Sequence, residues 1–153
     1  MNKENSVLLG TGVLSWDGIE RRSDRYGSVM LLAEGIDSTS INDQEGVLWQ
    51  ANLPDIGALG RLWVKVTDVR ESTHIGDIFR GIFPTTPVLG QEICLGTGRL
   101  FYDNCAGVYA TVGLRPDDGR DSDWLNPGQL YKVHEQSVEL YFEAIANWPP
   151  EGK

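Results

Sequence analysis

Hydrophobic residues along the chain recur mostly with the two-residue period of β-strands. Leu62, Val64 and Val66 alternate with Trp63 and Lys65, and a similar alternation runs through the segment near the C-terminus. Other apolar runs are short and are bounded by glycine or proline, as strands are. The pattern predicts strands at Val7–Trp16, Leu62–Val69, Ile93–Tyr102, Val108–Leu114 and Val138–Ala144, with further candidates at Ser28–Ala33 and Val47–Leu53.

Helical periodicity is weak, because 18 glycines and seven prolines interrupt most segments. The best helical spacing lies in His74–Phe83, and Asp121–Tyr131 has room for a helical turn. We therefore expect an all-β fold, a mostly antiparallel barrel or sandwich of roughly seven to ten strands with at most one or two short helices. A length of 153 residues suits one domain, 1–153, with a short proline-containing tail at 148–153.

Two segments of the chain resemble each other. VLLGTGVLSWDG begins at Val7 and ICLGTGRLFYDN begins at Ile93, and a glycine-led apolar run follows each. We interpret them as one hairpin pattern used twice, at 7–33 and 93–114, against the alternative of chance similarity between glycine-rich strands. A dinucleotide-binding loop is disfavoured, because Ser15 and Phe101 stand where its third glycine belongs.

The formal net charge is −9, and the acidic residues are concentrated in two segments. Glu34–Gly57 holds five acids and no Lys or Arg, and Asp117–Lys153 holds eight acids against three bases. Such a chain is repelled by phosphate backbones, so we expect no direct binding of duplex nucleic acid and favour a basic protein partner. MNKENSVLLG lacks the apolar core of a secretion signal, and no apolar run is long enough for a membrane helix, so we expect a soluble cytoplasmic protein that binds no membrane.

One acidic loop is the candidate partner-binding site. Its carboxylates do not have the spacing of a calcium loop, because a glycine stands where the second ligand of an EF-hand belongs and Arg120 lies among the acids. We therefore expect no metal and no cofactor, and favour a solvated loop beside an aromatic anchor for a protein partner. The candidate partner-binding residues are Trp124, Asp117, Asp118, Asp121 and Asp123.

A weaker candidate site for catalysis combines Glu71, His74 and Asp77, which recur at a spacing of three residues. On a helix they would share a face and present two carboxylates and an imidazole, a set suited to acid–base chemistry or zinc. The ordinary alternative is an acidic first helical turn. His134 beside Glu135 has no partner that the sequence identifies.

The two cysteines show no sign of catalytic or disulfide chemistry. Neither has a recognisable catalytic context, and two are too few for a disulfide framework. Cys94 lies in an apolar run, so we expect a small core residue there and a reduced thiol at both Cys94 and Cys105.

These observations favour a non-catalytic acidic binding module, an accessory subunit or adaptor of a larger protein assembly, which could include nucleic acid. Two alternatives remain open. One is an acidic inhibitor that mimics nucleic acid and blocks a basic protein. The other is a small-ligand-binding β-barrel or an enzyme, with its site at the mouth of the barrel.

Overall fold

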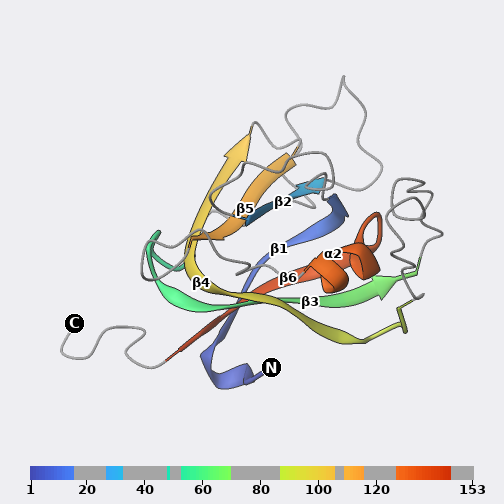
Figure 1. The fold of residues 1–153 in the computed structure, drawn as a ribbon, viewed down its shortest axis with the longest axis horizontal. Helices are drawn as coiled ribbons and strands as arrows, with labels where there is room; N and C mark the ends of the chain where they lie inside the picture. The colour runs from blue at the N-terminus through green and yellow to red at the C-terminus, as the bar shows by residue number, and fades with distance from the viewer. Residues whose placement is uncertain are drawn as a thin grey trace.

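The structure, a computed structural model, describes residues 1–15, 27–32, 48, 53–69, 87–105, 109–115 and 127–145. They form one ring of six antiparallel strands in the order β1-β2-β5-β4-β3-β6, which closes into a barrel (Figure 1). In chain order the elements are the 3-10 helix η1 (Lys3–Asn5), β1 (Ser6–Ser15), β2 (Gly27–Leu32), β3 (Leu59–Asp68), β4 (Glu92–Cys105), β5 (Tyr109–Arg115), α2 (Pro127–Val133) and β6 (Ser137–Ala144).

The inside of the barrel is filled by apolar side chains from every strand. Alternate residues of a strand point to opposite faces, and in β3 the inward set of Leu62, Val64 and Val66 is buried while Arg61 and Thr67 are exposed. The interior is therefore a packed core. Its members include Leu9, Leu14, Leu31, Leu62, Val64, Leu95, Leu100, Val112, Leu114, Leu140 and Phe142, each at most 1% exposed.

The short helix α2 belongs to the same core. Its residues Leu130 and Val133 are 1% and 0% exposed, and the helix lies against β4. A turn then leads into β6, and Glu135 in that turn adopts a φ of 66°. The backbone N–H of Glu135 donates to the carbonyl of Leu14 in β1, which fixes the turn to the barrel wall.

Two strands change partner along their length. β4 pairs with β3 up to Arg99, and from Arg99 onward it pairs with β5. β1 pairs with β6 up to Val13, and from Val13 onward it pairs with β2. Both changes come directly after a Leu-Gly-Thr-Gly segment, so the two similar segments occupy matching places in the ring.

The strand register repeats between the two halves of the ring. Where β1 pairs with β6, the pairing skips Leu9. Where β4 pairs with β3, the pairing skips Leu95, which holds the same position as Leu9 in the second Leu-Gly-Thr-Gly segment. Residue for residue, β6-β1-β2 therefore correspond to β3-β4-β5. We call this the two-fold correspondence. It is centred on Trp63 opposite Tyr141 between β3 and β6.

The expected all-β class is confirmed, and so are all five predicted strands and the candidate at Ser28–Ala33, with boundaries shifted by at most three residues. Within the described residues the ring has six strands, and the count of roughly seven to ten expected for the whole chain stays a prediction. Within the described residues of Val47–Leu53, Leu48 makes only an isolated bridge to Gly10. The predicted helix at His74–Phe83 lies outside the described residues. A helix does overlap the end of Asp121–Tyr131, at Pro127–Val133.

The expectation that Cys94 is a core residue is wrong. Its neighbours Ile93 and Leu95 point inward and are buried, so the strand alternation turns Cys94 outward, where it is half-buried. Its thiol lies 3.7 Å from the carbonyl oxygen of Gly96, and burial raises the pKa of this thiol. Cys94 is free of disulfide bonds, as expected.

The close approach of β5 to Gly98 in β4 gives a first prediction. A Cβ on Gly98 would lie 2.5 Å from the carbonyl oxygen of Arg115, so an alanine there must push the backbone of β5 away. We expect Gly98→Ala to lower the free energy of unfolding by about 1–3 kcal/mol. Thr97→Ala, at the exposed neighbouring position, is the matched control. Urea unfolding followed by tryptophan fluorescence measures both, and an unchanged midpoint for Gly98→Ala would contradict the close approach.

Candidate functional site

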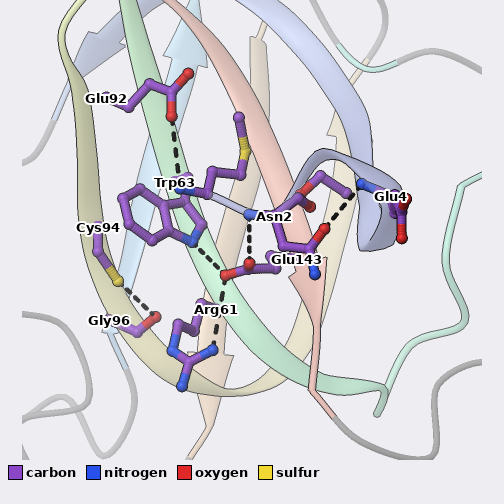
Figure 2. A network of polar contacts seen from close by, with 10 residues as sticks. Asn2, Glu4, Arg61, Trp63, Glu92, Cys94, Gly96 and Glu143 are labelled. Carbon is purple, nitrogen blue, oxygen red and sulfur yellow. Dashed lines mark hydrogen bonds and ion pairs between the residues drawn. The ribbon is translucent and has the colours of Figure 1, made fainter.

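A polar network lies on the outer face of β3, β4 and β6 and is centred on Glu143 (Figure 2). The strand alternation that sends Phe142 into the core turns Glu143 outward, yet Glu143 is only 6% exposed. A carboxylate buried to this degree needs hydrogen bonds or opposite charge to offset its lost hydration. The cover comes from the N-terminal segment Met1–Asn5.

Three groups satisfy this carboxylate. The backbone N–H of Asn2 donates to Oε2 at 2.6 Å, and the indole N–H of Trp63 donates to Oε1 at 2.8 Å. The guanidinium of Arg61 forms an ion pair with Oε1 at 3.7 Å. Trp63 and Arg61 lie on β3 directly across from β6, so the pairing of these two strands positions two of the three partners.

The pKa of Glu143 reflects a competition between burial and these partners. Burial by itself raises the pKa, but the hydrogen bonds from Asn2 and Trp63 and the charge of Arg61 outweigh it, so the pKa lies below its usual 4.5. An ionised carboxylate with a lowered pKa is a poor general base. The arrangement therefore fastens the chain rather than preparing it for proton transfer.

The N-terminal segment crosses the outer face from β6 to β4. The side chain of Met1 is 3% exposed, and its amino group lies 3.5 Å from Oε1 of Glu92 on β4. The side chain of Asn2 accepts the N–H of Glu4 at 3.0 Å and so caps η1, while its backbone carbonyl accepts the hydroxyl of Ser6 at 2.6 Å. Figure 2 shows Asn2 and Glu143 joined beside Trp63.

Charged pairs flank the aromatic pair at the centre of this face. Trp63 lies opposite Tyr141, with Arg61 opposite Glu143 on one side and Lys65 opposite Glu139 on the other. The hydroxyl of Tyr141 donates to Glu139 at 2.9 Å, and burial together with this carboxylate raises the pKa of Tyr141 to about 12. Cross-strand pairs of this kind stabilise a sheet.

A second group of buried polar side chains lies at the junction of α2 and β6. His134, Gln136 and Ser137 are 7%, 2% and 0% exposed. Nε2 of His134 lies 3.5 Å from Oε1 of the adjacent residue, Glu135. The hydroxyl of Ser137 has no hydrogen-bond partner among the residues that the structure describes. The side-chain NH₂ of Gln136 donates to the carbonyl of His134 at 3.4 Å.

The candidate residues from the sequence lie outside the described residues. This holds for the catalytic candidates Glu71, His74 and Asp77 and for the partner-binding candidates Trp124, Asp117, Asp118, Asp121 and Asp123. Both assignments stay predictions. Over the ranges that are described, no group of three or more His, Cys, Asp or Glu side chains is placed to hold a metal ion. Among the same residues, no helix is long and apolar enough to cross a membrane.

Sequence reasoning missed the role of Glu143 and of the N-terminal segment. The signal was present, because the outward face of Val138–Ala144 carries Tyr141 between Glu139 and Glu143 and is less polar than a solvated strand face. A strand face of this composition indicates that another segment of the chain partly buries it. The sequence does not say which segment provides it, since the hydrogen bond from Asn2 to Glu143 joins residues 141 positions apart.

The network predicts a stability loss in Glu143→Gln. The amide can accept only one of the two hydrogen bonds without turning its NH₂ group toward the other donor, and it loses the ion pair to Arg61. We expect the free energy of unfolding to fall by about 1–3 kcal/mol at neutral pH. Glu4→Gln, on the exposed surface of η1, is the control and should be unchanged. Equal stability of the two variants in urea would contradict the network.

The difference between wild type and Glu143→Gln should also depend on pH. Because the folded-state pKa is lowered, the unfolded chain takes up its proton first, and the contribution of Glu143 is fully present above pH 4.5. It is lost as the pH falls through the folded-state pKa. Unfolding in urea at a series of pH values measures this, and a difference that grows on acidification would show that the sign is wrong.

No protein-family model matches the sequence, and no curated protein or solved structure matches it either. What the protein does is therefore inferred from its own charges, packing and exposed side chains.

Proposed function

We propose that the protein is a non-catalytic acidic binding module that acts as an accessory subunit or adaptor and associates with a basic protein. The observation that carries the proposal is the distribution of charge: a net charge of −9, with the acids gathered in Glu34–Gly57 and Asp117–Lys153. A surface of this kind attracts a basic protein and repels nucleic acid.

The packing of the barrel supports binding at the outside of the molecule. The inward side chains of the described strands are apolar and closely packed, which leaves the outer faces and the connecting segments to meet a partner. A rigid sheet that carries binding residues on its connections is a common arrangement in proteins. The same packing disfavours a small ligand held inside the barrel.

The described outer face gives no specific support to mimicry of nucleic acid. A mimic needs carboxylates that stand in for phosphates, whereas Glu143 is paired with Arg61, and Glu139 lies opposite Lys65. Charge on this face is balanced within the protein. We therefore keep the adaptor function as the proposal.

Neutralising the acidic loop tests the proposal. Proteins captured by the purified chain from its native source are identified, purified, and titrated against wild type at low and at moderate salt. We expect binding to weaken as salt rises, and Trp124→Ala to weaken it more than any single Asp→Asn change at Asp117, Asp118, Asp121 or Asp123. The reason is that a buried aromatic anchor contributes about 2 kcal/mol or more, and an exposed charge pair about 1 or less.

Glu4→Gln on η1 removes one exposed acid outside both acidic segments and serves as the control, with binding unchanged. Direct binding of the purified chain to duplex DNA at moderate salt would overturn the proposal. So would a partner that binds equally well after Trp124→Ala and neutralisation of the four aspartates.

A further inference from the structure

The turn that precedes β4 holds two large apolar side chains in solvent. Val88 and Leu89 are 67% and 65% exposed, and Val69, just past the end of β3, is 37% exposed. The backbone N–H of Gly90 donates to the carbonyl of Val66 at 2.8 Å, which places this turn beside the end of β3. We call these three exposed residues, which lie at the same end of β3, the apolar tip.

The turn is fixed by hydrogen bonds rather than loosely attached. The N–H of Gln91 donates to the carbonyl of Val88 at 2.9 Å, and the side chain of Gln91 accepts the N–H of Val88 at 3.0 Å. Gly90 has a φ of +82°, the conformation that a glycine supplies at the third position of such a turn. The exposed side chains are therefore presented in a defined place at little cost in conformational entropy on binding.

The two-fold correspondence provides an internal comparison for this turn. Strand register matches Ser6 to Glu92, so the turn Asn2–Asn5 before β1 corresponds to the turn Val88–Gln91 before β4. Both turns close with a hydrogen bond from the fourth N–H to the first carbonyl, at 3.2 Å in the N-terminal turn. The residues just before them, Met1 and Pro87, both place their side chains against the barrel.

The corresponding turns differ in what they show to solvent. Asn2, Lys3, Glu4 and Asn5 are all exposed and all polar, whereas the matching positions in the second turn begin with Val88 and Leu89. The fold therefore accepts polar residues at this place. Packing among the described residues gives no reason for the two apolar side chains, and adjacent exposed apolar side chains can serve as a protein contact.

From this contrast we infer that the apolar tip is the docking point for a protein partner with an apolar recess bordered by basic residues. The inference rests on the proposed function and adds a second place of contact to the acidic loop that carries Trp124. Exposed Asp68 lies at the end of β3 next to Val69, and the chain carries a charge of −9, so a basic border is complementary. A second copy of the chain is disfavoured as the occupant because two such charges repel.

The test uses a soluble helical peptide built from Leu and Lys as a probe with an apolar face and a basic border. It is titrated into the full-length chain labelled with ¹⁵N, at low salt. We expect the largest chemical-shift changes at Asp68, Val69 and the turn Val88–Gln91. Val88→Asn combined with Leu89→Gln gives the turn polar residues like those of its counterpart, and should raise the Kd about tenfold or more.

The matched control is Ile56→Gln. Ile56 is also an exposed apolar residue, at 62%, and lies before the opposite end of β3, so its replacement should leave the Kd unchanged. A peptide with Glu in place of Lys should not bind. Unfolding in urea should show that the double variant keeps its stability within about 0.5 kcal/mol, as surface substitutions do.

The results separate the two proposals. Lys-dependent binding that maps away from the tip and survives the double variant overturns the apolar tip and leaves the basic partner standing. No binding of the Leu–Lys peptide, or equal binding of the Leu–Glu peptide, overturns both. A dimer in sedimentation that the double variant abolishes would show that the occupant is a second copy, and would also overturn the inference.

Discussion

The staggered pairing of β1 and β4 around their Leu-Gly-Thr-Gly segments is the constraint on which the barrel depends. A sheet closes into a barrel only if its strands tilt and their register is staggered, and in these two strands the pairing with one neighbour gives way to pairing with the other at matching residues, Val13 and Arg99. The register shifts at Leu9 and Leu95 add local twist, as bulges do. At Gly98 the neighbouring backbone comes too close for any side chain.

Much of this fold could be predicted from the sequence because its determinants are local. The alternation of Leu62, Val64 and Val66 marks the buried face of β3, and the repeated Leu-Gly-Thr-Gly segments mark matching strands. The duplication as an origin for that match stays a prediction. The same alternation predicts the outward orientation of Cys94, because a strand buries only every second residue of the apolar run in which this cysteine lies.

The site was harder to predict because it depends on residues far apart in the chain. Glu143 looks like an ordinary acid on a strand, and only the folded structure brings Asn2 and Trp63 to it. The apolar character of Val88 and Leu89 is visible in the sequence, but their exposure is not, since a Pro-Val-Leu run before a strand suits a buried position equally well. Local composition carries no information about which segments cover a given face.

The two-fold correspondence also has a consequence for how the chain is made. The half formed by β3, β4 and β5 is continuous, so it can pair its strands as soon as Arg115 is available. The other half joins β1 and β2, which are synthesised first, to β6, which comes last. Until β6 leaves the ribosome, the first part of β1, which includes Val7, lacks the strand with which it pairs. Among the described strands, β1 is thus translated first and is among the last to be fully paired.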